Sequence, residues 1–145
     1  MTVHRDKFWD YARSKPQETD LIGTYRGTLV GESKIADPTS LGEITLTLSK
    51  NGAGQISALP VFDTGGRKLL SSISGDVAWR VSKPFNPNGE EWWLEVTSVA
   101  QGSVSAAVKE MLVLERCPPH RFFMIVGNPD DYVGVEFKLL ANQPR

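Results

Sequence analysis

The chain has 145 residues, of which 40% are hydrophobic and 23% are charged, and its formal net charge at pH 7 is -1. This composition is typical of one globular domain that is long enough to bury a core without disulfides or metals. The charge is near zero and no block of like charges occurs, so the usual electrostatic driving force for binding nucleic acid is missing. We therefore expect no nucleic-acid partner.

The cysteine content and the apolar runs bear on the compartment. Cys117 is the only cysteine, so no intrachain disulfide can form, which fits a reducing compartment. Residues 1–20 are charged throughout and lack the apolar segment of a signal peptide. No stretch approaches the ~18–20 apolar residues that a membrane span requires. We expect a cytoplasmic protein with no membrane span.

The first segment, RDKFWDYAR (residues 5–13), has helical spacing. Phe8 and Trp9, followed by Tyr11 or Ala12, form one apolar stripe over about two turns. This spacing predicts a short helix, which Pro16 ends. We predict an N-terminal helix and lead-in over residues 1–20, followed by a single domain over residues 21–145.

The segments that follow alternate between apolar and polar residues. In EITLTL (residues 43–48), the isoleucine and both leucines share one face and the threonines share the other, which predicts a strand. The next four residues, NGAG, indicate a hairpin, because Asn51 and Gly52 tolerate positive φ. The strand after this turn is expected to end at Pro60. The segments expected to be strands are residues 21–30, 43–48, 55–59, 76–81, 91–96, 110–116, 121–126 and 133–139.

Eight short strands with few connections long enough for a crossover helix predict an antiparallel all-β fold. An up-and-down barrel is the natural closure of such a chain, because it removes exposed strand edges. A sandwich is the main alternative. We predict an eight-stranded antiparallel barrel.

Two stretches resemble known proteins. PQETDLIGTYRG (residues 16–27) places a Gly-x-aromatic step at the start of the first strand and resembles the lipocalin-like superfamily. FFMIVGNPDDYVGVEFKL (residues 122–139), with Gly75, Asp76 and Trp79 upstream, resembles a group of uncharacterised small bacterial proteins. The resemblance covers roughly residues 16–140 and implies a lipocalin-like barrel.

The chain departs from the lipocalin pattern at two positions. Tyr25 stands where lipocalins carry tryptophan, and Lys138 is the nearest candidate for the arginine that packs over that ring. Lipocalin-like barrels bind very different molecules, or none, so the resemblance implies no particular ligand.

The adjacent tryptophans of EWWLEV (residues 91–96) must point to opposite faces of a strand. Trp92 shares the apolar face with Leu94 and Val96, whereas Trp93 shares its face with Glu91 and Glu95. Trp93 is therefore the outward ring. A second part of the chain covers it, or it belongs to a partner interface.

The interior of the predicted barrel offers candidate ligand contacts. Two strands, EMLVLER and RFFMIV, are apolar on both faces. Large side chains fill an eight-stranded barrel or leave room for one small ligand, and both alternatives stay open here. Candidates for contact with an apolar ligand are Tyr25, Trp79, Met111 and Phe123; Phe122, Met124 and Tyr132 also belong to the apolar set that would line a pocket.

No convincing catalytic or metal-binding constellation is present. Cys117 and His120 resemble a thiol–base pair, but Asp130 and Asp131 follow at the far end of a strand about 20 Å long and cannot orient that histidine. The same aspartates with Glu136 lack the spacing of a calcium loop. His4 and His120 are too few and too far apart for zinc. We expect no enzyme activity, no metal and no cofactor.

These observations favour a non-catalytic binding protein. The first hypothesis is a protein that neutralises or sequesters a protein partner, such as an immunity protein that acts on a toxin. Its expected contact residues are Trp93, Glu91, Glu95, Phe85 and Asn86. The alternative is a lipocalin-like carrier that holds a small apolar ligand inside the barrel.

Overall fold

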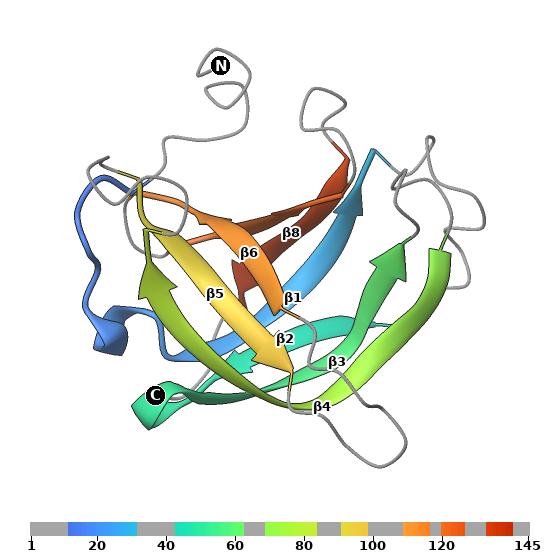
Figure 1. Ribbon diagram of the computed structural model, residues 1–145, viewed down its shortest axis with the longest axis horizontal. Helices are drawn as coiled ribbons and strands as arrows, with labels where there is room; N and C mark the ends of the chain where they lie inside the picture. Colours follow the sequence, from blue (N-terminus) through green and yellow to red (C-terminus); the bar gives the residue numbers. More distant parts are fainter. Residues whose placement is uncertain are drawn as a thin grey trace.

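The computed structural model describes residues 12–31, 43–62, 69–83, 91–98, 109–116, 120–126 and 133–140. These residues form one closed antiparallel barrel in which each strand pairs with the next and β8 pairs back with β1 (Figure 1). The strands are β1 Gly23–Val30, β2 Ile44–Leu48, β3 Ala53–Phe62, β4 Leu69–Ser82, β5 Trp93–Ser98, β6 Lys109–Leu114, β7 Phe122–Ile125 and β8 Gly134–Leu139. The predicted eight-stranded up-and-down barrel of lipocalin-like type is confirmed, and the sandwich is excluded.

The middle strands are longer than their alternation predicted. β3 continues through Pro60, which lies opposite Ser72 of β4, so the expectation that the strand ends at Pro60 is wrong. The pairing of β3 with β2 stops at Ser57. Beyond that residue β3 is an edge strand on its β2 side, which is where a sheet tolerates proline.

Large apolar side chains fill the interior of the barrel. Alternate residues of every strand point inward, as the pleat requires. The Tyr25 and Phe122 rings stack with centroids 4.6 Å apart and planes tilted by 48°. The inward side chains that are 4% exposed or less include Tyr25, Leu46, Leu48, Trp79, Leu94, Leu114, Phe122 and Phe137.

The lead-in closes one end of the barrel, called here the closed end, at which β1, β3, β5 and β7 begin. A single 3-10 turn, η1 Glu18–Asp20, brings Leu21 into the core, where its side chain is fully buried. The Tyr25 hydroxyl donates a hydrogen bond of 2.7 Å to the Leu21 carbonyl. Upstream, the Ala12 N–H donates to Leu114 O at 2.8 Å, and the Trp92 N–H donates to Ala12 O at 3.0 Å. The lead-in is thus hydrogen-bonded to β1, to the end of β6 and to the start of β5.

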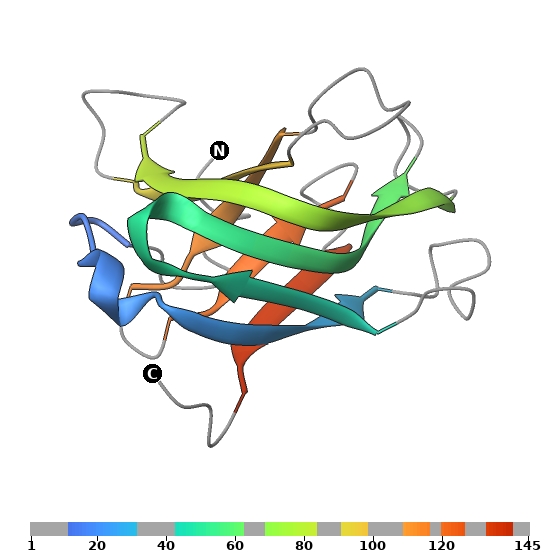
Figure 2. The same ribbon diagram turned by 90° about the horizontal axis from the view of Figure 1, so that it is seen from below.

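Trp79 secures the same end from the opposite wall. Its indole N–H donates to the Ala53 carbonyl at 2.7 Å and to the Ser49 carbonyl at 3.0 Å, on either side of η4 Lys50–Gly52. In that turn Asn51 and Gly52 have φ of 63° and 73°, so the hairpin predicted there is confirmed. Figure 2 shows η1 and this turn at the same end of the barrel.

The helix predicted over residues 5–13 lies mainly outside the described residues. Within the described residues the chain is not helical from Ala12 to Gln17, and η1 follows. No helix in this part of the chain is long and apolar enough to cross a membrane.

A β-bulge interrupts the long β3–β4 hairpin. The register shifts between Ile56 and Leu59, and Ala58 in between has a φ of 59°, a left-handed conformation that is unfavourable for any residue with a Cβ. The Ala58 N–H donates to the Ser74 hydroxyl at 2.9 Å, which partly compensates for the lost ladder bond.

Replacing Ala58 with glycine is expected to raise the free energy of unfolding by about 1 kcal/mol, because glycine adopts the left-handed conformation without steric cost. Urea unfolding measures the change. The matched control, Ala78→Gly at an exposed position of β4, should instead lower stability by roughly 0.5–1 kcal/mol. An equal loss in both variants would contradict a strained bulge at Ala58.

Replacing Tyr25 with phenylalanine should lower the free energy of unfolding by about 1–2 kcal/mol, because the buried Leu21 carbonyl loses its donor. Faster hydrogen exchange of the Leu21 amide, relative to amides of β4, would place the loss at the closed end. Unchanged stability together with unchanged exchange would show that the hydroxyl does not hold the lead-in.

Candidate functional site

The two adjacent tryptophans point to opposite faces, as predicted. Trp92 packs against the barrel core, whereas Trp93 lies on the outer face with Val113 and Phe123, its neighbours across β6 and β7. These three residues and Met111, which packs against them, are called here the outer cluster. The Trp93 side chain is 8% exposed within this single chain. This burial favours cover by the chain itself over the alternative of an exposed partner interface.

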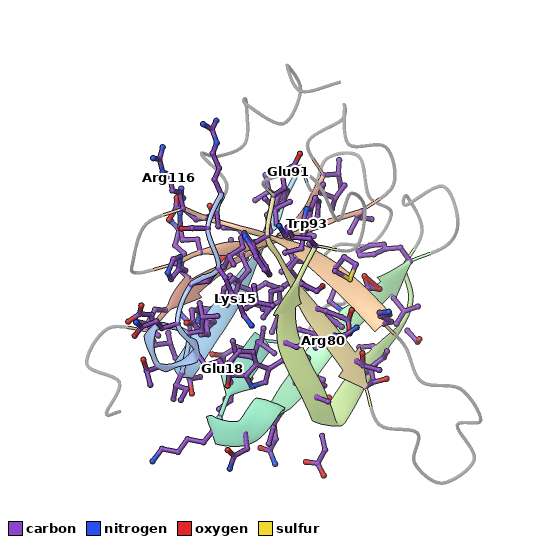
Figure 3. The ribbon with its side chains drawn as sticks, turned by 60° about the vertical axis from the view of Figure 1, so that its left-hand side comes forward. Lys15, Glu18, Arg80, Glu91, Trp93 and Arg116 are labelled. Atoms are coloured by element: carbon purple, nitrogen blue, oxygen red, sulfur yellow. The ribbon has the colours of Figure 1, made fainter. Side chains whose placement is uncertain are left out.

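Ion pairs border the outer cluster on the β4 side. The Glu95 carboxylate accepts hydrogen bonds from Arg80 Nε at 2.8 Å and Nη2 at 3.3 Å, and Lys109 Nζ lies 3.4 Å away. Burial alone would raise the pKa of Glu95, but the hydrogen bonds and charges of Arg80 and Lys109 outweigh it and lower this pKa below its ordinary range. Figure 3 shows Glu91 and Trp93 near one end of β5 and Arg80 farther along β4.

The other residues expected at a partner interface do not extend the outer cluster. Glu91 is half-buried just before β5, while Phe85 and Asn86 lie outside the described residues. Glu95 is occupied by its two basic partners. Sequence reasoning correctly placed Trp93 and Glu95 on one outer face, but the structure gives both a role inside the chain.

A second ion-pair network borders the cluster on the β8 side. Arg121 bridges Glu115 and Glu136, and its Nη1 lies 2.9 Å from Glu136 Oε2. Lys138 Nζ lies 3.5 Å from the same carboxylate, with its side chain 62% exposed. Lys138 therefore points outward, so its expected role as the cation packed over Tyr25 is wrong. Among the described residues no set of three acidic, histidine or cysteine side chains gathers as metal ligands.

His120 has a structural environment. Its ring is 3% exposed, and Nδ1 lies 2.6 Å from the Glu115 carbonyl oxygen in the turn between β6 and β7. Cys117, Asp130 and Asp131 lie outside the described residues. The hydrogen bond to the main chain compensates for the burial of the His120 ring.

The four candidate ligand residues do not form one site. Tyr25 and Trp79 point inward, but both are hydrogen-bonded parts of the closed end. Met111 and Phe123 belong to the outer cluster, so their expected place inside the barrel is wrong. Because β6 and β7 are apolar on both faces, the alternation of their residues could not determine which face points inward. The Phe123 ring lies over Gly134, where an added Cβ would come within 2.7 Å of it.

The opposite end of the barrel, called here the mouth, contains a pocket of about 160 Å³. β3 and β7 both contribute to its wall, although they are four strands apart in the eight-stranded ring. Residues from opposite walls can line one space only across the barrel opening. The described residues that line it are Pro60, Val61, Phe62, Glu110, Met124, Ile125 and Val126.

Glu110 is the one titratable residue among the described residues of this lining, and it is the feature that sequence reasoning missed. It shares the inward face of β6 with Leu112 and Leu114, and it lies opposite Val96 of β5. Its carboxyl has no hydrogen-bond or ion-pair partner in the described part of the chain, and burial raises the pKa of this carboxyl. A glutamate in phase with two core leucines in EMLVLER was the available signal.

Comparisons with known protein families, with curated proteins and with solved structures found no match for this chain. The class that the structure defines is thus a class of fold, the closed eight-stranded antiparallel barrel of lipocalin-like type, with a filled closed end and an acidic pocket at its mouth.

Replacing Glu95 with glutamine should lower the free energy of unfolding by about 1 kcal/mol at pH 7, because the charged hydrogen bonds from Arg80 are lost. The folded pKa of Glu95 is lowered, so its stabilising effect is complete above the pKa of the unfolded chain. It disappears as the pH falls through the folded value. Urea unfolding at pH 7 and at about pH 3 should therefore show the difference shrinking in acid.

The matched control is Glu43→Gln. Glu43 pairs with Arg26 at 2.9 Å, but the two side chains are 63% and 57% exposed. Loss of such an exposed pair should change stability by less than about 0.5 kcal/mol. Equal effects of the two substitutions, or a Glu95→Gln effect independent of pH, would contradict the account of Glu95.

Proposed function

We propose that the protein is a binding protein that takes up a small ligand in the pocket at the barrel mouth. The observation that carries this proposal is Glu110, an inward carboxyl with no hydrogen-bond or ion-pair partner among the described residues, beside a pocket of about 160 Å³. Keeping an unpaired charge partly out of water costs stability, and residues with such environments cluster at functional sites.

The size of the pocket supports a small ligand. A cavity of about 150 Å³ in another protein accommodates benzene, whereas pockets for drug-sized ligands have about 300–1,000 Å³. The remaining interior is occupied by side chains such as Trp79, Phe122 and Phe137. This narrows the carrier hypothesis to molecules about the size of one substituted ring and argues against a fatty acid or a sterol.

The protein-partner hypothesis, including an immunity protein that neutralises a toxin, stays a prediction with less support. Its main anchor, Trp93, is 8% exposed within the chain, and Glu95 is already paired with Arg80 and Lys109. Interface anchors usually contribute by burying an exposed aromatic ring against the partner. The mouth pocket, in contrast, has a half-buried carboxyl group, Glu110, with no hydrogen-bond or ion-pair partner among the described residues.

Neutral benzyl alcohol is expected to bind at the mouth with an affinity on the order of millimolar, since small fragments gain little energy in total. In ¹⁵N–¹H correlation spectra, the amide shifts should concentrate on Val61, Phe62, Glu110 and Val126. Val126→Phe, which fills the pocket, should weaken binding at least about tenfold, at a stability cost of about 1–3 kcal/mol that thermal unfolding would reveal.

The matched control is Thr28→Phe, which adds an aromatic ring at an exposed position of β1. This variant should bind like the wild type. Shifts spread over the outer wall of the barrel, or equal binding by a folded Val126→Phe variant, would overturn the proposed site.

A further inference from the structure

We propose that the ligand of the mouth pocket is a small organic cation, an amine with a compact apolar body whose ammonium group pairs with the Glu110 carboxylate. This inference rests on the proposed function and names its ligand class. The inference concerns the charge of the ligand, whereas the proposed function concerns only its size and its place of binding. An experiment can therefore contradict the inference without contradicting the proposed function.

The chemistry of the lining selects for positive charge. Apart from Glu110, the described residues that line the pocket have apolar side chains: Pro60, Val61 and Phe62 from β3, and Met124, Ile125 and Val126 from β7 and the residue after it. In such surroundings a lone carboxylate repels anions, and a neutral ligand leaves its charge uncompensated. An ammonium group is the donor that neutralises it directly, through a charge-assisted hydrogen bond.

No basic side chain of the described barrel supplies that charge. The nearest basic neighbour along the strand is Lys109, which points to the other face of β6 and lies 3.4 Å from Glu95 on the outer wall. Across the strand pair, Val96 faces Glu110. The described interior of the mouth therefore leaves Glu110 without a counter-charge while providing space next to it.

A metal ion fits the pocket less well than an amine. Calcium takes six to eight oxygen ligands and magnesium usually uses more than one carboxylate or phosphate group. The described lining provides a single carboxyl group and no other acidic side chain. An ammonium group needs only one good acceptor, which the Glu110 carboxylate provides, and the other described lining residues offer apolar side chains to the carbon atoms attached to it.

The test compares three ligands of nearly the same shape: benzylamine, benzyl alcohol and benzoate. Dissociation constants would be measured by the amide shifts of the pocket residues at pH 7, in the wild type, in Glu110→Gln and in Glu18→Gln. Glu18 is exposed in η1 at the closed end, so Glu18→Gln makes the same change in net charge far from the mouth.

In the wild type, benzylamine should bind at least about tenfold more tightly than benzyl alcohol, and benzoate should bind more weakly than either. Glu110→Gln should remove the preference for the amine, so that benzylamine and benzyl alcohol bind this variant with similar dissociation constants. Glu18→Gln should keep the preference.

Equal binding of the amine and the alcohol by the wild type, or a preference that survives in Glu110→Gln, would overturn the cation proposal and leave the proposed function intact. No pocket shifts with any of the three ligands would overturn the proposed function, and the cation proposal with it.

The pH dependence provides an independent readout. Benzylamine stays protonated throughout the acid range, and Glu110 is the only titratable group among the described lining residues. Binding of the amine should therefore weaken as Glu110 takes up a proton, starting above the ordinary carboxyl range because burial raises its pKa. Binding of benzyl alcohol should not weaken over the same range; parallel losses for both ligands would contradict the proposal.

Discussion

The whole structure depends on the packing of large side chains into one end of a narrow barrel. An eight-stranded barrel is just wide enough for inward side chains to fill it. At the closed end, Tyr25 and Phe122 stack, and Trp79 donates to the carbonyls of the facing turn. The hydroxyl of Tyr25 then fixes Leu21, and so the lead-in, over the barrel opening. Leu21 and Leu114 are fully buried at that end.

The pocket that Glu110 lines lies at the other end of the barrel, the mouth. The side chains on the outer wall of β5, β6 and β7 are used in contacts within the chain. Trp93, Val113 and Phe123 are buried there, and ion pairs flank them on both sides. The structure thus contains two kinds of glutamate, paired and unpaired. Glu95 and Glu136 are paired and stabilise the wall, whereas Glu110 is unpaired in the described structure and faces a pocket.

The barrel could be predicted from sequence because several strands alternate clearly between apolar and polar residues. In ITLTL (residues 44–48), only one face is apolar, so the inward residues follow directly. The orientation of Trp92 and Trp93 followed from the same rule. Where both faces are apolar, as in β6 and β7, the rule fails, and Met111 and Phe123 were accordingly assigned to the wrong side.

Other features had weaker signals. The continuation of β3 past Pro60 depends on where β2 stops pairing, which is a property of the whole sheet. The residue type does not indicate the left-handed backbone at Ala58, because alanine rarely adopts this conformation. Glu110 did carry a signal, a charged residue in phase with core leucines. It is informative only once the barrel is closed and the position of the mouth is known.

The measurement that tests the filled barrel most directly is native mass spectrometry of the protein purified under mild conditions. The account predicts the mass of the chain alone, or of the chain with a molecule about the size of one substituted ring, because Tyr25, Trp79, Phe122 and Phe137 occupy the rest of the interior. A stoichiometric adduct of the mass of a fatty acid or a sterol would contradict it, since such a ligand requires space that these side chains fill.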